Sequence, residues 1–381
     1  MKNQLKHFFK QQHLILLFAC WAFVQFALLN HYGIITNNEA VKYTREAHNI
    51  LAGKNFSEQK YIFYSVYIFI HILFIKLGCE TIGVYIFQLF VNLIATYLFY
   101  KTALNIYRSR SFAFIAALLL VICIPFQYWT ICLYTESLFC SLIIIFMYCL
   151  FGISAGRHVK YLISILILIL LLFSRPTGIF FIGAIGITIL YKLLKDRKTT
   201  IAISGACIFI AGFIFLFNYE MNSAASYNFI KPFLEHNVIC DVPLSNSINQ
   251  PNVYGTGTNA VLLYIKNNPS EFLQLCCLRF ISFWGFVRPF YTGAHNWMLR
   301  LFFYPLYVFA VIGLIKQWKT KRALMIFCLS VIIIFTISVM LTCDEWSNRF
   351  MMPVIPIIIF LASCGIYAVF SKRLQKQANH S

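Results

Sequence analysis

The fold of this chain is decided by residues 13–35, which read HLILLFACWAFVQFALLNHYGII. An α-helix rises 1.5 Å per residue, so about twenty apolar residues cross the roughly 30 Å of hydrocarbon in a bilayer. The run is too long for the apolar region of a cleavable signal peptide and lacks a small-residue cleavage site. We therefore expect it to remain in the protein as a membrane anchor.

Apolar runs of similar length recur along the rest of the chain. The candidate spans are 13–35, 81–100, 112–127, 134–153, 160–173, 176–194, 199–218, 299–315, 323–342 and 349–370. The sequence thus predicts an all-α, polytopic integral membrane protein with about ten transmembrane helices.

The composition excludes an ordinary soluble domain. Hydrophobic residues make up 60% of the chain and charged residues 11%, whereas soluble chains are about 25% charged. The net charge of +19 comes from short basic clusters between apolar runs rather than from one basic domain, so we expect no nucleic-acid partner. Most of the 13 Cys lie inside apolar runs, and Cys276-Cys277 has no partner at zinc-ligand spacing. The sequence predicts neither a disulfide framework nor a metal cluster.

The distribution of Lys and Arg predicts the topology. If the N-terminal tail is cytoplasmic and 61–78 lies along the outer surface, most basic residues face the cytoplasm, as the positive-inside rule requires. They fall in 2–10, 101–110, 157–160, 192–198, 316–322 and 372–376, and every acid but Asp196 lies outside or at an outer helix end. If 61–78 spans with the same N-terminus, the later clusters turn outward, against the rule. A third arrangement, with the N-terminus outside and eleven spans, satisfies the charge count equally well and stays open.

Two stretches between the spans are long enough to carry structure outside the membrane. One is the outer loop 36–80. The other is 219–298, where 245–252 is typical of a loop and the apolar spacing after Pro269 predicts a surface-lying helix. The expected division is a catalytic-type transmembrane module at 1–218, an extracytoplasmic loop at 219–298, and C-terminal helices with a cytoplasmic tail at 299–381. No internal repeat favours an inverted-repeat transporter.

Four groups of polar residues lie at the predicted outer boundary of the membrane. The first group is Glu39 with Tyr43 and Glu46, which share one helix face because they are spaced by four and seven residues. The other groups are Tyr134-Thr135-Glu136-Ser137, Ser174-Arg175-Pro176-Thr177-Gly178, and Arg279 with Arg288 and the stretch Asp344 to Arg349. A guanidinium is a bidentate clamp for phosphate, and a carboxylate can take the proton of an attacking hydroxyl or amine. Carboxylates and arginines on one membrane face thus suit a lipid-phosphate substrate. The alternative is that they are interfacial anchors.

The order of these motifs resembles that of the GT-C glycosyltransferases, in particular the bacterial branch with the aminoarabinose and protein-mannose transferases. The resembling residues are Glu39-Ala40-x-x-Tyr43, Tyr134-Thr135-Glu136-Ser137-Leu138-Phe139, Ser174-Arg175-Pro176-Thr177-Gly178 and Arg349-Phe350-x-x-Pro353. Each motif is short, and their order carries the resemblance. It implies juxtamembrane helices in the first outer loop, with Glu39 as the catalytic base. Many relatives have a second acid at the position of Asn38, and its absence here weakens the inference of a divalent metal, which only some branches of the family use. A divalent metal is left open, and no metal ligand is assigned.

We therefore expect an inverting glycosyltransferase in a bacterial cytoplasmic (inner) membrane, with its active site facing outward. The donor would be a polyprenyl-phosphate sugar reached from the membrane lipids, and the acceptor a glycan, lipid or protein. Glu39 would be the base, and the substrate-binding residues would be Tyr43, Glu136, Arg175, Arg288 and Arg349. A transporter or flippase of lipid-linked saccharide is the alternative, with the same arginines but no base. A third hypothesis is a membrane scaffold. The clustering of acids with arginines argues against it.

Overall fold

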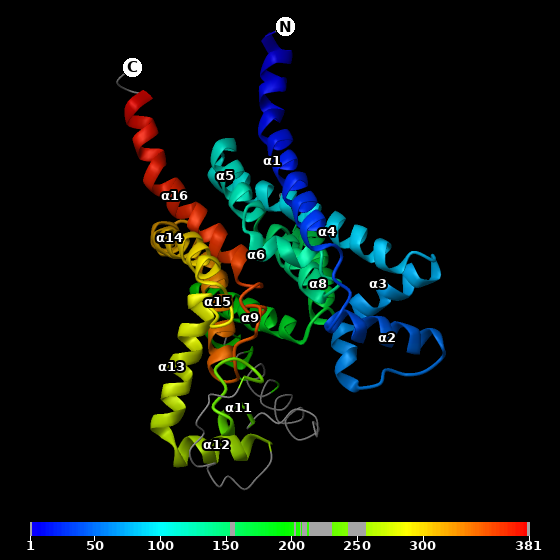
Figure 1. The fold of residues 1–381 in the computed structure, drawn as a ribbon. Helices are drawn as coiled ribbons and strands as arrows, with labels where there is room; N and C mark the ends of the chain where they lie inside the picture. The colour runs from blue at the N-terminus through cyan, green and yellow to red at the C-terminus, as the bar shows by residue number, and fades with distance from the viewer. Residues whose placement is uncertain are drawn as a thin grey trace. The chain divides into compact units, whose positions relative to one another are not determined.

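The computed structural model describes residues 2–152, 157–201, 203–205, 207, 212, 231–242 and 257–378. Within these ranges the secondary structure is helical, with three isolated β-bridges and no strand. The prediction of an all-α chain with membrane-length apolar helices is confirmed (Figure 1). The predicted loop 245–252 and most of the predicted span 199–218 lie outside the described residues.

The first half of the chain is a series of long and short helices. In order they are α1 (Lys2–Tyr32), α2 (Glu39–Leu51), η1 (Gln59–Tyr64), α3 (Ser65–Lys76), α4 (Glu80–Tyr107), α5 (Arg110–Val121), α6 (Ile124–Gln127), η2 (Tyr128–Thr130), α7 (Thr135–Met147), the π-turn η3 (Tyr148–Gly152), α8 (Arg157–Leu172), η4 (Pro176–Gly178) and α9 (Ile179–Lys195). The described remainder holds α11 (Lys231–Leu234), α12 (Gly257–Asn267), α13 (Pro269–Gly285), α14 (Gly293–Gln317), α15 (Arg322–Met340) and α16 (Ile355–Ala378). The helix expected after Pro269 is present as α13.

Fewer helices than the sequence predicts are long enough to be clear membrane spans. In the described residues six meet the length and apolarity of a span: Gln12–Tyr32, Glu80–Tyr107, Thr135–Gly152, Pro176–Lys195, Gly293–Gln317 and Arg322–Met340. The shorter apolar helices His158–Leu172 and Ile355–Phe370 fall below that length. Ten spans therefore stays a prediction.

Two predicted spans differ from the structure in detail. The stretch 112–127 is not one straight helix, because α5 ends at Val121 and the chain continues as α6 and η2 at an angle of 64°. Pro125 lies in the first turn of α6, where its missing N–H is tolerated but where it cannot continue a preceding helix. The last predicted span begins at Ile355 rather than at 349, since the residues before it form turns.

The segment 61–78 is too short to cross a bilayer as a helix. It holds most of η1, and then α3, which has 12 residues and is therefore about 18 Å long against roughly 30 Å of hydrocarbon. With α2 it forms a folded loop between α1 and α4, whose return after α2 is fixed by the buried carboxylate of Glu46. That carboxylate accepts hydrogen bonds from the backbone N–H (2.9 Å) and the hydroxyl (2.6 Å) of Ser57. This geometry favours the surface-lying arrangement over the eleven-span one.

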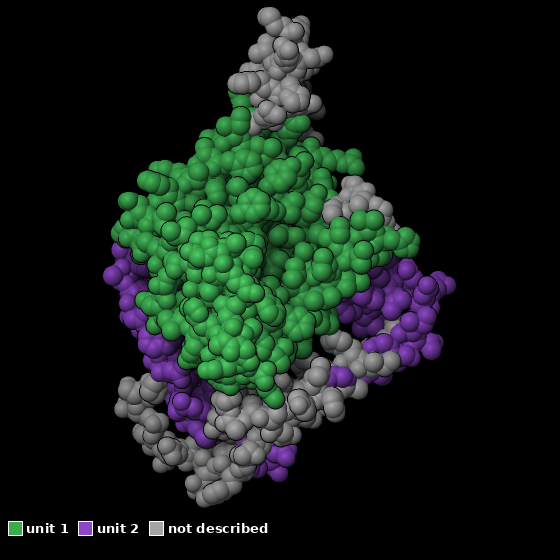
Figure 2. Space-filling view, turned by 90° about the vertical axis from the view of Figure 1, so that its right-hand side faces the viewer, with its two compact units in different colours: residues 1–182, 306–318, 355–381 green, residues 183–305, 319–354 purple. Residues whose placement is uncertain are grey.

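The described chain groups into two compact units, coloured in Figure 2. The first holds residues 1–182, 306–318 and 355–381, and the second holds 183–305 and 319–354. These units divide the chain at other points than the domain boundaries expected from the sequence. Within the first unit, Gly313 and Gly365 let α14 and α16 approach so closely that a Cβ on either glycine would collide with the backbone of the other helix.

The second unit contains a disulfide that the sequence reasoning excluded. Cys240 and Cys343 are bonded, with their Cα atoms 5.2 Å apart, across 103 residues of sequence. The expectation of no disulfide was wrong because both residues lie outside the apolar runs, and their proximity depends on long-range pairing. Here Cys240 N–H donates to the carbonyl of Asp344 (2.7 Å), and Asp344 N–H donates to the carbonyl of Val238 (2.8 Å).

Candidate functional site

A short backbone pairing brings Glu39 and Glu136 to the same end of two parallel segments. Ile35 N–H donates to the carbonyl of Ile131 (2.9 Å), and Leu133 N–H donates to the carbonyl of Ile35 (3.0 Å), which makes a parallel bridge between Ile35 and Cys132. Glu39 follows Ile35 by four residues and begins α2, and Glu136 follows Cys132 by four and lies in the first turn of α7. Since paired parallel segments run in the same direction, both helices start at the same end of the bridge. Each carboxylate is also favoured by the positive end of its helix dipole.

Glu136 and Arg175 form a buried ion pair. Arg175 Nη1 lies 2.6 Å from Glu136 Oε1, and the two side chains are 7% and 0% exposed. Arg175 occupies the polar break between α8 and η4 that the sequence indicated. Gly178 in η4 lies so close to the carbonyl of Leu171 that a Cβ there would meet it at 2.4 Å. The chain can therefore fold back tightly on α8 only with glycine at this position, and the tight return directs the guanidinium inward.

Tyr43 joins the two glutamates to an aromatic cluster from the outer loop. It is 2% exposed, and its ring lies 5.6 Å from the ring of Tyr64 and 5.2 Å from that of Tyr67. Burial raises the pKa of the Tyr43 phenol well above its usual value, and the charges of Glu136 and Glu39 raise it further, while Arg175 opposes them. The phenol therefore keeps its proton at neutral pH and can act as a hydrogen-bonding group but not as a base.

Glu39 is the more accessible of the two carboxylates. Its side chain is 27% exposed and its Oε1 lies 2.7 Å from Nζ of Lys42. Asn38, immediately before it, has a φ of 52° and a ψ of −112°, a backbone conformation that residues other than glycine adopt only rarely. Two carboxylates thus start neighbouring helices in different environments, one reaching solvent and one buried against a guanidinium. That contrast is typical of sites where two acids have different roles.

Arg288 and Arg349 belong to the second compact unit, whereas the group of Glu39, Tyr43, Glu136 and Arg175 forms within the first. Arg288 is fully buried: Nη2 lies 2.7 Å from Oδ2 of Asp344, Nε donates to the carbonyl of Trp346 (3.2 Å), and Nη1 donates to Ser282. All three of its nitrogens are thus directed at protein acceptors. Arg349 is 13% exposed and lies 3.7 Å from Glu345.

Arg279 belongs to the same polar group as Arg288 in the sequence. In the structure it is held by backbone carbonyls and an aromatic ring. It donates to the carbonyls of Asn237 (2.9 Å), Pro232 (2.9 Å) and Met340 (3.2 Å), and its guanidinium lies 4.5 Å from the ring centre of Phe233. Burial lowers its pKa to about 10, so it remains charged at neutral pH. Together with the disulfide, this arginine holds 231–242 to α13 and to the end of α15.

The sequence motifs did not indicate a buried polar network that lies in the first unit. Gln25 Nε2 donates to Oε1 of Gln127 (2.8 Å), and Gln127 Nε2 donates to the carbonyl of Leu120 (3.0 Å). Gln25 is a single amide within an apolar run. The only sequence signal for the network was that an unpaired amide in hydrocarbon is costly, which implies a hydrogen-bond partner.

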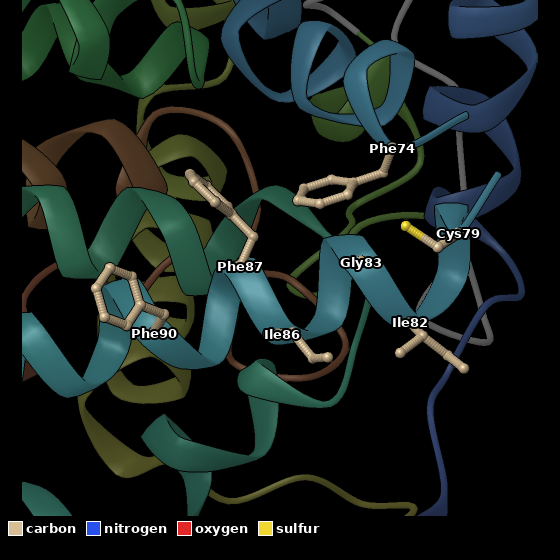
Figure 3. A pocket seen from close by; sticks show the side chains of 7 residues that line it. All are labelled: Phe74, Cys79, Ile82, Gly83, Ile86, Phe87 and Phe90. Atoms are coloured by element: carbon tan, nitrogen blue, oxygen red, sulfur yellow. The ribbon is translucent and has the colours of Figure 1, made fainter. Parts of the chain in front are cut away.

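The described residues contain no group of three or more His, Cys, Asp or Glu that could hold a metal ion. They do contain an apolar groove of about 430 Å³ between α3 and α4, where Phe74, Gly83 and Phe87 are among the lining residues (Figure 3). Its lining is apolar throughout and includes none of the predicted site residues. We place the chemistry at the carboxylate–arginine group, because a groove without polar atoms can hold hydrocarbon but cannot move a proton.

No family model, no curated protein and no solved structure matches this chain. The candidate site therefore rests on the geometry of its own residues.

Proposed function

We propose that this protein is an inverting glycosyltransferase that moves a sugar from a polyprenyl-phosphate donor to an acceptor at the outer face of a bacterial cytoplasmic membrane. The observation that carries the proposal is the Ile35–Cys132 bridge. It brings an accessible carboxylate, Glu39, to the same end of a paired segment as the buried Glu136–Arg175 pair. A base and a phosphate-binding cation near each other are what transfer from a lipid phosphate requires.

In the proposed reaction Glu39 takes the proton from the acceptor hydroxyl or amine. The acceptor atom then bonds to the anomeric carbon from the face opposite the phosphate, while the bond from that carbon to the phosphate oxygen breaks. The bonding pair leaves with the polyprenyl phosphate, and the anomeric configuration is inverted. A general base of this kind contributes about 100-fold or more to the rate.

Arg175 would bind the donor phosphate and stabilise the charge that develops on it. A guanidinium carries five N–H donors in a fixed fork, so it can hold a carboxylate and a phosphate oxygen at once. Glu136 fixes the direction of that fork through its 2.6 Å contact. The protonated phenol of Tyr43 would donate a hydrogen bond to the sugar or the phosphate. Arg288 and Arg349 remain weaker candidates, since Arg288 is occupied by Asp344 and neighbouring carbonyls.

The surroundings of the site suit a lipid-linked donor. The apolar groove beside α4 matches the hydrocarbon of a prenyl chain, and α4 is long and apolar enough to span the membrane. Disulfides form in oxidising compartments, so the Cys240–Cys343 bond supports an extracytoplasmic position for the second unit's loops. No divalent metal is needed for the steps given above.

A transporter or flippase of lipid-linked saccharide is the second candidate. The buried amides of Gln25, Gln88, Asn92 and Gln127 favour it, because a polar substrate crossing the membrane needs polar contacts. In the structure, however, these amides bond to one another, to Trp21 and to backbone carbonyls. That pattern is typical of a structural network.

Deleting the gene and analysing lipids and envelope glycans by mass spectrometry tests the proposal. We expect a polyprenyl-phosphate sugar to accumulate and the modified acceptor to disappear. Wild-type protein should reverse both changes, and Glu39→Gln, made at the same level, should reverse neither. A flippase predicts the same accumulation with full rescue by Glu39→Gln, and an unchanged lipid and glycan profile would exclude both functions.

A further inference from the structure

Gln88 is a fully buried glutamine on α4 whose amide is saturated by hydrogen bonds to other segments. Its Nε2 donates to the carbonyls of Thr130 (3.2 Å) and Cys132 (3.0 Å), and its Oε1 accepts a hydrogen bond from the hydroxyl of Tyr67. One side chain thus contacts the segment before Glu136 and the outer-loop helix α3.

The backbone contacts of Gln88 alternate with those of the bridge. Gln88 takes the carbonyls of Thr130 and Cys132, while the carbonyl between them, that of Ile131, accepts the N–H of Ile35. Gln88 and the segment before Glu39 therefore share three consecutive carbonyls of this stretch, and the amide holds the stretch in the register that the bridge uses.

The third contact of Gln88 extends to Tyr43. The hydroxyl of Tyr67 bonds to the amide oxygen, and the ring of Tyr67 meets the ring of Tyr43 edge-on at 5.2 Å. Tyr43 in turn is buried, and the charges of Glu136, Arg175 and Glu39 bear on its phenol. Gln88 is thereby linked to the segment before Glu136 and, through Tyr67, to Tyr43.

We propose that Gln88 is a positioning residue, which sets the placement of Glu39, Glu136 and Tyr43 relative to one another without touching substrate. Its role in catalysis rests on the proposed function, whereas its role in the geometry does not. Asn92 provides a matched control, because it lies one turn further along α4, is also buried, and bonds through its amide to Trp21 (2.8 Å) rather than to the bridge.

The first experiment measures the geometry without any substrate. Cys132 is not in a disulfide and is paired with Ile35 in the bridge, so Ile35→Cys should form a disulfide with it on oxidation with iodine, quantified by peptide mass spectrometry. Adding Gln88→Met, which keeps the length of the side chain and removes the amide, should lower the yield at least about threefold, because the paired segment loses its register. Asn92→Leu should leave the yield unchanged. Equal yields in Gln88→Met and the parent would overturn the proposal.

The second experiment separates positioning from loss of structure. With undecaprenyl phosphate as the probe, Gln88→Met should lose less in binding than in turnover, because Arg175 keeps its place on another segment and only the direction that Glu136 gives its guanidinium is disturbed. Its turnover of the donor identified from the deletion strain should fall at least tenfold. If Gln88→Met does not fold, Tyr67→Phe removes only the hydroxyl contact, and it should keep the cross-link while lowering turnover.

These outcomes distinguish the two claims. Absence of donor turnover in the wild-type protein would refute the proposed function and leave the cross-linking result to decide the geometry. A folded Gln88→Met variant with lowered cross-linking and full turnover would refute the positioning role alone. Full turnover in Tyr67→Phe would refute the link from Gln88 to Tyr43.

Discussion

The candidate site depends on how charged side chains are buried in the first unit. Glu136 and Arg175 are 39 residues apart in sequence and both lie beside apolar runs, where an unpaired charge is costly. Their pairing offsets that cost. Removing one partner of a buried ion pair lowers the stability of a protein by about 3–5 kcal/mol. The same pair carries the proposed phosphate recognition, so stability and donor affinity have to be measured separately.

For Arg175 we predict that Arg175→Lys keeps the fold but weakens binding of undecaprenyl phosphate by about tenfold, because lysine keeps the charge and loses the planar fork. Arg175→Ala should bind more weakly still and be destabilised, since it leaves the Glu136 carboxylate buried without its cation. Arg322→Lys, at an exposed position in a predicted cytoplasmic cluster, serves as the control and should bind like wild type. Unchanged donor affinity in both Arg175 variants would make this arginine an anchor rather than a phosphate ligand.

The sequence indicated Glu39, Glu136 and Arg175 because each is a charged residue at the edge of an apolar run, a pattern with few physical explanations. It could not show that Arg288 is surrounded by Asp344 and by carbonyls from 345–346, because those contacts join positions more than 50 residues apart. Charged residues at predicted boundaries were therefore found, but their partners were not.

At the level of secondary structure, the loop 36–80 is built from short helices that depend on one another. His71 on α3 is fully buried, with Nδ1 lying 3.2 Å from Glu80 Oε1 and 3.4 Å from the hydroxyl of Thr44. Glu80 also lies 3.8 Å from His48 of α2. Burial lowers the pKa of His71 below its usual 6.5, although the hydrogen bond and charge of Glu80 oppose the shift and His48 adds to it.

This shift predicts that acid loosens the packing of α2 on α3. A histidine whose pKa is lowered by folding contributes stability that is present above about 6.5 and is lost as the pH falls through the folded pKa. Hydrogen-exchange protection in α3 should therefore drop between pH 7.5 and pH 5.5. In His71→Leu the drop should be much smaller. An equal drop in both proteins would assign the acid sensitivity to other groups.

The disulfide of the second unit gives a further prediction. Closing a loop of this size, with the cysteines 103 positions apart in the sequence, stabilises a fold by about 2–5 kcal/mol. Cys343→Ser should therefore lower Tm by roughly 5–15 °C. Cys277→Ser removes an exposed free cysteine and should leave Tm unchanged. Equal Tm values for wild type and Cys343→Ser would show that the bond does not form in the cell.

Helix patterns were predictable at this scale, and helix ends were less so. Apolar runs identified α1, α4, α14 and α15 directly, because each is one uninterrupted helix. The kink after Val121 was missed, since Pro125 lies inside a run whose composition alone is compatible with one span. The disulfide was missed because two isolated cysteines in different loops carry no local signal.

At the scale of the whole molecule, the topology decides which face the site uses. We predict that Asn55→Cys, an exposed position in the loop between α2 and η1, reacts with a membrane-impermeant maleimide in intact cells. The background should lack the other accessible cysteines, and a cysteine at Lys319, in a predicted cytoplasmic cluster, should react only after permeabilisation. Labelling of Asn55→Cys only after permeabilisation would place the site on the cytoplasmic face and contradict the proposed function.

The central claim is that Glu39 is the base of a sugar transfer from a lipid phosphate, and turnover by purified protein tests it most directly. Wild-type and Glu39→Gln proteins in lipid nanodiscs would receive the donor identified from the deletion strain, with release of polyprenyl phosphate followed by mass spectrometry. We predict that Glu39→Gln turns over about 100-fold more slowly while binding undecaprenyl phosphate as tightly as wild type. Turnover by Glu39→Gln near the wild-type rate would contradict the account.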